Sequence, residues 1–162
     1  MNKDNPIKNL LIVSHSPSLN TKLLSQHMLD AAIQVNSDYP KNIDVCLVPA
    51  LEATHREVIK ASAIMLITPE NLGYMSGGMK DFFDRIYYPC LEEKQGLPIC
   101  AIIRAGQDGT GTKRALETIT KGLKWRWVQE PLICRGQWST GFISQAEELA
   151  QTMTMALHEG II

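Results

Sequence analysis

The sequence predicts an α/β protein whose parallel β-sheet is covered by helices on both faces. Short, continuous apolar runs alternate with amphipathic segments along the whole chain, which is the order that βαβ units produce. Right-handed crossovers then join the strands into one doubly wound sheet. No internal repeat, low-complexity tract or long linker interrupts this order, so we expect residues 1–162 to form a single domain.

Five strand-like segments make up the predicted sheet. Leu10–Ser14, Ala63–Ile67 and Ile99–Ile103 are continuous apolar runs, as strands buried on both faces usually are. Apolar residues alternate with others in Ile43–Leu47, which is typical of a more peripheral strand. The last strand falls within Val128–Cys134.

Five helix-like segments follow these strands, each with apolar residues at helical spacing. They are Thr21–Val35, Ala53–Lys60, Met79–Tyr87, Ala115–Leu123 and a last helix with its apolar stripe at Leu149–Leu157. Pro89 is predicted to end the third helix, because proline cannot continue the hydrogen-bond ladder. Ser144 and Glu147 have the spacing of a capping box and are predicted to open the last helix.

Composition excludes several functional classes. A formal charge of −1 and a pI near 6.4 give no electrostatic footprint for nucleic acid or an anionic membrane. The four cysteines form no CxxC pair and three lie in strand-like runs, so we expect reduced, buried thiols. The first residues are polar and no apolar run reaches membrane length, which predicts a cytoplasmic protein without a membrane partner.

The loop His15–Thr21, which follows the first strand, is rich in hydroxyl and amide side chains. It carries Ser16, Ser18, Asn20 and Thr21 but no lysine or arginine. A helix start presents unpaired N–H groups and the positive end of the helix dipole, so such a loop can hold a phosphate without cationic side chains. The alternative is an ordinary helix cap, which needs only one such residue.

Two more loops are predicted at the same edge of the sheet. Thr68–Gly78 is long for a connection between a strand and a helix. Its proline and glycines allow the backbone to approach a flat ligand, and Leu72 and Tyr74 could lie against a ring face. Alternatively, it is a flexible glycine loop whose Tyr74 covers the core. Arg104–Thr112 contains three glycines. Together the three loops indicate a planar heterocycle attached to a phosphate. Neither a Walker motif nor a dinucleotide fingerprint is present.

Together with Ala105–Gly109, the His15–Thr21 loop and the Thr68–Arg85 segment resemble the flavodoxin-like superfamily, and within it the NAD(P)H-dependent flavin reductases. The resemblance covers nearly the whole chain and implies a five-stranded sheet in the order 2-1-3-4-5 with FMN at the switch point. It implies that Ser16, Ser18, Asn20 and Thr21 hold the FMN phosphate, that Pro69, Glu70, Asn71, Leu72, Gly73 and Tyr74 contact the isoalloxazine, and that Ala105, Gly106, Asp108 and Gly109 border its other edge. Leu19 departs from the family, because many relatives have glycine there.

The resemblance implies an FMN-dependent oxidoreductase that takes hydride from NAD(P)H and passes electrons to a small-molecule acceptor such as a quinone or a flavin. The flavin supplies the chemistry, so no catalytic side chain is expected, and relatives imply a homodimer. One alternative is a flavodoxin-type electron carrier that does not oxidise NAD(P)H. Such carriers are usually strongly acidic, whereas this chain is nearly neutral, which favours an enzyme. A flavin-free module that binds another ligand or a protein is the third possibility.

The sequence also suggests roles for a few other side chains. Lys80 and Asp84 have the spacing of a solvated helical ion pair. His15 either faces the ligand or makes a structural hydrogen bond. The other histidines have no partner at ligand spacing, so no metal site is expected. The three tryptophans, at 125, 127 and 138, are expected in the core or in a subunit contact.

Overall fold

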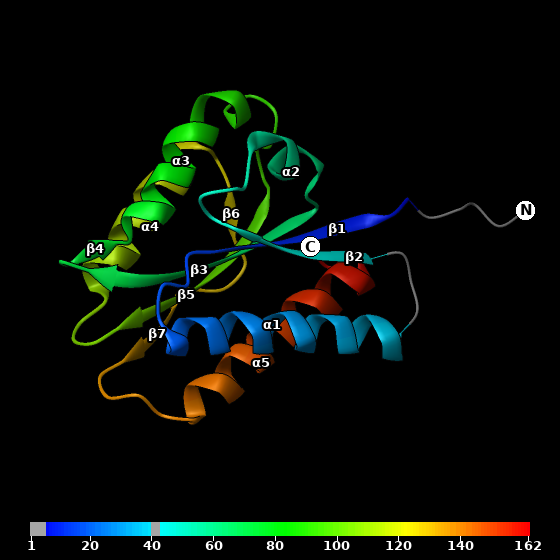
Figure 1. Ribbon diagram of the computed structural model, residues 1–162. Coiled ribbons are helices and arrows are strands. Elements are labelled where there is room, and N and C mark those ends of the chain that lie inside the picture. The colour runs from blue at the N-terminus through cyan, green and yellow to red at the C-terminus, as the bar shows by residue number, and fades with distance from the viewer. Residues whose placement is uncertain (1–5, 40–42) are drawn as a thin grey trace, which may run out of the picture.

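The computed structural model describes residues 6–39 and 43–162 and has three layers, a central sheet between two layers of helices (Figure 1). In chain order the elements are β1 (Lys8–Ser14), α1 (Leu19–Asp38), β2 (Ile43–Pro49), α2 (His55–Lys60), β3 (Ala63–Asn71), β4 (Tyr74–Met75), α3 (Gly77–Cys90), β5 (Pro98–Ala105), α4 (Thr110–Gly122), β6 (Arg126–Trp127), β7 (Leu132–Arg135) and α5 (Gly141–Glu159). None of the helices in these ranges is both long and apolar enough to cross a bilayer.

The sheet has the predicted strand order. Its path is β2-β1-β3-β5-β6, with β7 also paired to β5, and all of these pairs are parallel. The two-residue strand β4 is antiparallel to the end of β3. The order 2-1-3-4-5 is therefore confirmed along this path, with β5 as the fourth predicted strand, but the described residues form a sheet of seven strands and not the predicted five.

The fifth strand differs from the prediction. Instead of one strand within Val128–Cys134, the chain forms β6 and β7, which pair with opposite ends of β5. Pro131 lies between them and has no N–H to donate. The ladder is therefore interrupted where a continuous strand would need a donor.

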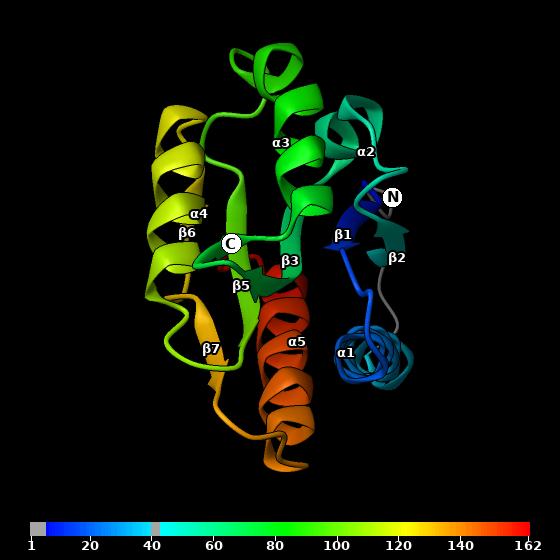
Figure 2. The ribbon, with the colours of Figure 1, turned by 60° about the vertical axis from the view of Figure 1, so that its left-hand side comes forward.

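Two hydrophobic cores lie on opposite faces of the sheet. Helices α2, α3 and α4 cover one face, and α1 and α5 cover the other (Figure 2). The central strands supply alternate residues to each core: Leu11 and Val13 face the first, whereas Leu10 and Ile12 face the second. All four of these side chains are buried, which explains why β1 is apolar along its length.

Two helix boundaries were predicted wrongly. Helix α3 contains Pro89 in its last turn and ends one residue later, at Cys90. Helix α5 begins at Gly141 after Thr140, so Ser144 lies inside the helix and does not cap it. The carboxylate of Glu147 instead accepts a hydrogen bond of 2.7 Å from Nδ1 of His27 on α1. A contact between two distant helices therefore uses the side chain that local spacing assigned to a cap.

Candidate functional site

The loops after β1, β3 and β5 lie together at the carboxyl edge of the sheet. In the strand order, β2 lies on one side of β1, and β3 and β5 lie on the other. The connections after β1 and β3 therefore run in opposite directions, which makes this edge the topological switch point where doubly wound proteins bind ligands. The three predicted loops therefore meet at this edge.

The first loop ends in a reciprocal cap at the start of α1. The backbone N–H of Thr21 donates to Oγ of Ser18, and the N–H of Ser18 donates to Oγ1 of Thr21, both at 3.2 Å. The first turn contains no acidic residue. Within the described residues, the N–H groups of Leu19 and Asn20 have no hydrogen-bond partner. The helix start therefore keeps two donors and the positive end of its dipole available for an anion.

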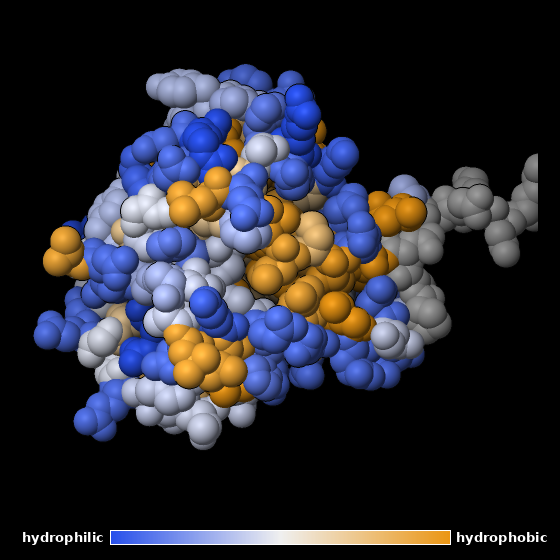
Figure 3. Space-filling view, viewed as in Figure 1, coloured by the Kyte–Doolittle hydropathy of each residue, from blue (hydrophilic) through white to orange (hydrophobic). Residues whose placement is uncertain are grey.

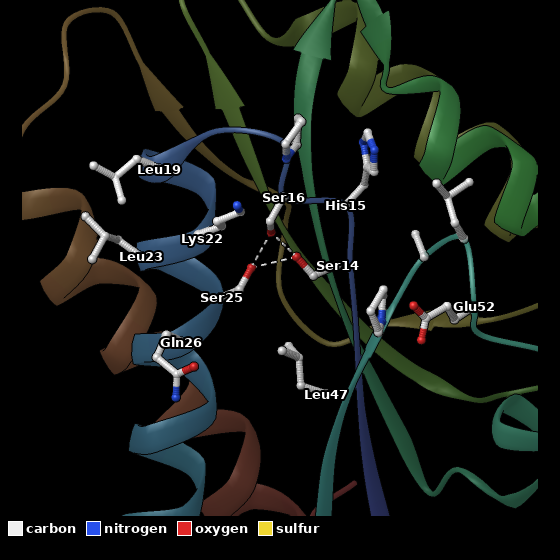
Figure 4. A pocket seen from close by; sticks show the side chains of 14 residues that line it. Ser14, His15, Ser16, Leu19, Lys22, Leu23, Ser25, Gln26, Leu47 and Glu52 are labelled. Atoms are coloured by element: carbon white, nitrogen blue, oxygen red, sulfur yellow. Dashed lines mark hydrogen bonds between the residues drawn. The ribbon is translucent and has the colours of Figure 1, made fainter.

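The hydroxyl of Ser16 points away from this helix start. It contacts the hydroxyl of Ser14 and, at 2.6 Å, that of Ser25, and Ser14 and Ser25 are also 2.6 Å apart (Figure 4). Ser25 in turn donates to the Thr21 carbonyl at 2.9 Å. These three serines lie at the floor of a cavity of about 610 Å³ between α1 and the end of β2. An anion bound at the start of α1 would contact the Ser16 hydroxyl only after the Ser16 side chain had rotated away from Ser14 and Ser25.

His15 joins the first loop to the second. The backbone N–H of His15 donates to the carbonyl of Ile67 at 3.0 Å. Its ring packs on the start of α3, where a Cβ added to Gly78 would lie only 2.6 Å from Cδ2 of the histidine. Nδ1 of His15 is buried and has no partner among the described residues. The ring therefore fills the space that a side chain at position 78 would need, which favours glycine there. Sequence reasoning did not single out Gly78.

The second loop is a rigid hairpin and not a flexible glycine loop. Glu70 pairs with Met75, and Asn71 pairs with Tyr74. Leu72 and Gly73 have φ angles of 55° and 74°, so they form a two-residue turn of the type I′ kind. Leu72 is fully exposed at the tip, and the side chain of Tyr74 is about 40% exposed, so it does not simply cover the core.

The base of the hairpin is held by Thr68 and Ser76. The N–H of Ser76 donates to Oγ1 of Thr68 at 3.1 Å, and the two hydroxyls also lie 3.1 Å apart. Both side chains are buried. This clamp fixes the direction in which the hairpin leaves the sheet.

The carboxylate of Glu70 connects the second loop to the third. It accepts hydrogen bonds from the N–H of Gly109 at 3.0 Å and from the hydroxyl of Thr112 at 2.9 Å. Gly109 precedes α4 with a φ of 78° and has no side chain with which to cap it. Glu70 therefore caps α4 from another loop. The carbonyl of Gly73 also packs so closely on Gly111 that no Cβ fits there.

Two arginines connect β7 to its neighbours, Arg135 to the third loop and Arg104 to the end of β5. The guanidinium of Arg135 donates to the carbonyl of Asp108 at 2.7 Å. Arg104 donates to the carbonyls of Cys134 and Gly136 at 3.0 and 2.7 Å, and lies over the ring of Phe142. Sequence reasoning missed both arginines, because their partners are backbone carbonyls on β7 and the loops beside it, which no local pattern reveals.

The remaining predictions about individual side chains are mostly confirmed. Lys80 and Asp84 form the expected ion pair, at 2.5 Å. Trp125 is buried in the core, and Trp127 donates from its indole N–H to Thr120. All four cysteines are free, but Cys46 is exposed, so the expectation of buried thiols is wrong at that position.

Comparison with known proteins places the chain in a family. The model of the family described as NADPH-dependent FMN reductase matches residues 12–139. No curated protein sequence matches the chain. Among solved structures, a flavodoxin from the domain Archaea has a TM-score of 0.75 at 16% identity, covering 93% of this chain and 99% of its own. A WrbA-like flavodoxin from Agrobacterium tumefaciens has a TM-score of 0.74 at 16% identity, with 94% and 98% covered.

An oxidoreductase from Corynebacterium diphtheriae gives a TM-score of 0.72 at 14% identity, with 96% of this chain and 99% of that chain covered. At such identities the structures establish the fold, which is flavodoxin-like. The family match is broader evidence, because it extends from β1 through the three loops to the residues before α5. The chain therefore belongs to the NADPH-dependent FMN reductase family of the flavodoxin-like superfamily.

Proposed function

We propose that the protein is a cytoplasmic, homodimeric FMN-dependent oxidoreductase that oxidises NAD(P)H and reduces a small-molecule acceptor such as a quinone or a flavin. The observation that carries the proposal is the meeting of three loops at the switch point, where His15 and Glu70 join them into one rigid unit. Family membership supports it. Four free thiols agree with a reducing compartment.

The residues at the start of α1 fit the phosphate of FMN. The free N–H groups of Leu19 and Asn20, together with the side chains of Ser18 and Asn20, would hold it, and Thr21 would keep the loop in shape through its cap on Ser18. Ser16 would join them after turning from Ser25. We expect backbone amides to supply most of this binding, because the hydroxyls of the first loop are already bonded to one another.

The second and third loops fit a flat ring. Residues 69–74 and 105–109 would border the isoalloxazine, which, when bound, supplies the two-electron chemistry. Glu70 does not present a free negative charge to it, because its carboxylate is bonded to the N-terminus of α4. The hairpin would position the ring and keep water from one side of it. None of these roles requires a nucleophile or a general base from the protein.

An enzyme fits the chain better than an electron carrier. The formal charge is −1, so the protein generates little long-range field with which to steer a charged redox partner. A small acceptor needs no such field. With FMN bound, the nicotinamide and the acceptor would react with it in turn, which predicts ping-pong kinetics.

The proposal is tested by anaerobic titration with FMN followed by stopped-flow mixing with NADPH or NADH. We expect saturable quenching of FMN fluorescence and then rapid bleaching of the flavin. The variant Asn20→Asp places a negative charge beside the free N–H groups and should weaken FMN binding at least about tenfold, a loss of about 1.4 kcal/mol. Gln151→Glu makes the same charge change on the exposed face of α5 and should leave binding unchanged.

Two outcomes would overturn the proposal in different ways. A protein that binds FMN but is not bleached by either nicotinamide is an electron carrier. A protein that takes up no FMN is a module for another ligand.

A further inference from the structure

A second cavity lies between the C-terminal half of α4 and β6, and we call it the α4–β6 cavity. Its volume of about 440 Å³ is within the range of ligand pockets. The residues that line it include Glu117, Lys121, Lys124, Trp125, Trp127 and Glu130. β6 pairs with Pro98 and Ile99 at the start of β5, so the cavity lies away from the sheet edge where the three loops meet. The apolar surface over β2 in Figure 3 adjoins the cavity at the first loop and belongs to the candidate flavin site.

An indole N–H at the α4–β6 cavity lacks an acceptor. Trp125 lines the cavity and is only 6% exposed. Its Nε1 is buried and has no hydrogen-bond partner among the described residues. The neighbouring Trp127, by contrast, donates from its indole N–H to Oγ1 of Thr120 at 2.9 Å. A buried tryptophan N–H usually finds a partner, so the N–H of Trp125 calls for an acceptor that the described residues do not supply.

The two lysines that line the cavity are available to a ligand. Within residues 6–39 and 43–162, neither Lys121 nor Lys124 forms an ion pair or a side-chain hydrogen bond. The carboxylates of Glu117 and Glu130 lie 4.0 and 3.1 Å from Nζ of Lys113. The cavity therefore combines tryptophan rings with two ammonium groups, which suits a flat apolar body that carries a negative charge.

Lys124 occupies a backbone position where glycine is usually more stable. α4 ends in a Schellman motif, in which the N–H of Trp125 donates to the carbonyl of Thr120 at 3.0 Å. The N–H of Lys124 donates to the carbonyl of Lys121, also at 3.0 Å. The motif places Lys124 at a φ of 56°, in the left-handed region where glycine is preferred. A lysine in such a strained position beside a cavity is expected to serve binding and not stability.

We propose that the α4–β6 cavity binds a small planar organic anion, an aromatic carboxylate, separately from the flavin. The carboxylate accepts the indole N–H of Trp125 and pairs with the ammonium groups of Lys121 and Lys124. The aromatic ring packs on the tryptophan side chains. α4 runs from the third loop to this cavity, and Thr110 and Lys121 are roughly 16 Å apart along the helix axis. The ligand therefore does not compete with FMN, and the proposal does not rest on the proposed function.

The first test is titration of the isotopically labelled protein with 2-naphthoate, followed by NMR through the indole N–H signals of the three tryptophans. We expect the Trp125 signal to move downfield and to saturate, because its N–H gains a carboxylate acceptor. Trp138 packs in the core on the other face of the sheet, so its signal should not move. The neutral 2-naphthamide has nearly the same shape and should bind at least about tenfold more weakly, because it lacks the charge.

Three results of this titration would overturn the proposal. They are a Trp125 signal that does not move, equal binding of 2-naphthoate and 2-naphthamide, and displacement of 2-naphthoate by added FMN. A protein that takes up no FMN still gives the first two readouts. The failure of this proposal is therefore distinguishable from the failure of the proposed function.

The second test separates binding from stability at Lys124. Lys124→Gly removes an ammonium group and relieves the left-handed strain, so it should raise the Tm by a few degrees and yet weaken 2-naphthoate binding about threefold to fivefold. Lys60→Gln removes the same charge at the C-terminal end of α2 and should leave binding unchanged. A Lys124→Gly variant that binds 2-naphthoate as tightly as the unmodified protein would overturn the assignment of the anion to these lysines.

Discussion

At the scale of single residues, the turn of the hairpin has an unfavourable side chain. Leu72 has a φ of 55°, although its exposed side chain has no protein contact that would compensate for the strain. The left-handed conformation costs most residues about 1–2 kcal/mol, whereas asparagine and glycine tolerate it. A strained, exposed leucine beside a candidate site is a feature expected to serve function and not stability.

We therefore expect Leu72→Asn to stabilise the protein. Removing the strain should raise the free energy of unfolding by about 1 kcal/mol, which corresponds to roughly 2–4 °C in Tm for a chain of this length. Thermal unfolding followed by circular dichroism measures the change. The same variant should reduce turnover if Leu72 contacts the ring or the acceptor.

Gly73→Ala is the matched control at the neighbouring position. Gly73 has a φ of 74°, and a Cβ there would have no atom within 4 Å, so only backbone strain changes. We expect a loss of about 1 kcal/mol. If Leu72→Asn and Gly73→Ala had the same free energy of unfolding, the turn would be able to relax, and the left-handed conformation of Leu72 would not destabilise the protein.

At the scale of elements, α4 depends on a residue from another loop. Gly109 offers no side chain, so the carboxylate of Glu70 satisfies the first N–H groups of the helix. It also neutralises the positive end of the helix dipole. The hairpin and α4 are therefore expected to open together.

We expect Glu70→Gln to lower the free energy of unfolding by about 1–2 kcal/mol, because it removes a charged cap and one acceptor oxygen while keeping the size of the side chain. Hydrogen exchange should become faster at Gly109–Lys113 and in the hairpin. Asp84→Asn is the control, because its exposed ion pair with Lys80 should contribute less than about 0.5 kcal/mol. Faster exchange confined to α4 would contradict the coupling.

At the scale of the whole molecule, the buried thiols make stability depend on alkaline pH. Burial raises the pKa of Cys90 and Cys134 to about 11 and that of Cys100 to about 12. Unfolded thiols lose their protons near pH 8.5, about where cysteine ordinarily titrates. Between these values the unfolded state binds fewer protons, so the free energy of unfolding falls as pH rises.

We expect urea unfolding curves to show this fall from about pH 9 upward, by at most about 1.4 kcal/mol per pH unit for each thiol. In Cys100→Ala the free energy of unfolding should fall less steeply with pH, because the contribution of one buried thiol is removed. This difference in slope does not depend on how much stability the variant loses at neutral pH. Cys46→Ser should change the slope less, because Cys46 is exposed in the native state. An unchanged slope in Cys100→Ala would contradict the assignment.

The resemblance to the flavodoxin-like superfamily implied the strand order, and the sequence pattern by itself determined the layered α/β architecture and the identity of the three loops. These features follow from local patterns: apolar runs such as Leu10–Ser14 and Ala63–Ile67 are buried wherever they lie in such a sheet, and a parallel sheet brings its loops to one edge. The hydroxyl-rich loop was also recognisable, because its cap is made by residues three positions apart.

Only the tertiary structure decided how individual side chains are used. Glu70 caps a helix 39 residues away, Glu147 bonds to His27 instead of capping its own helix, and Arg104 binds carbonyls near β7. Each of these partners is distant in sequence, so local spacing carries no information about it. Packing in three dimensions determines which acceptor a charged side chain reaches, and the sequence pattern determines only which element carries that side chain.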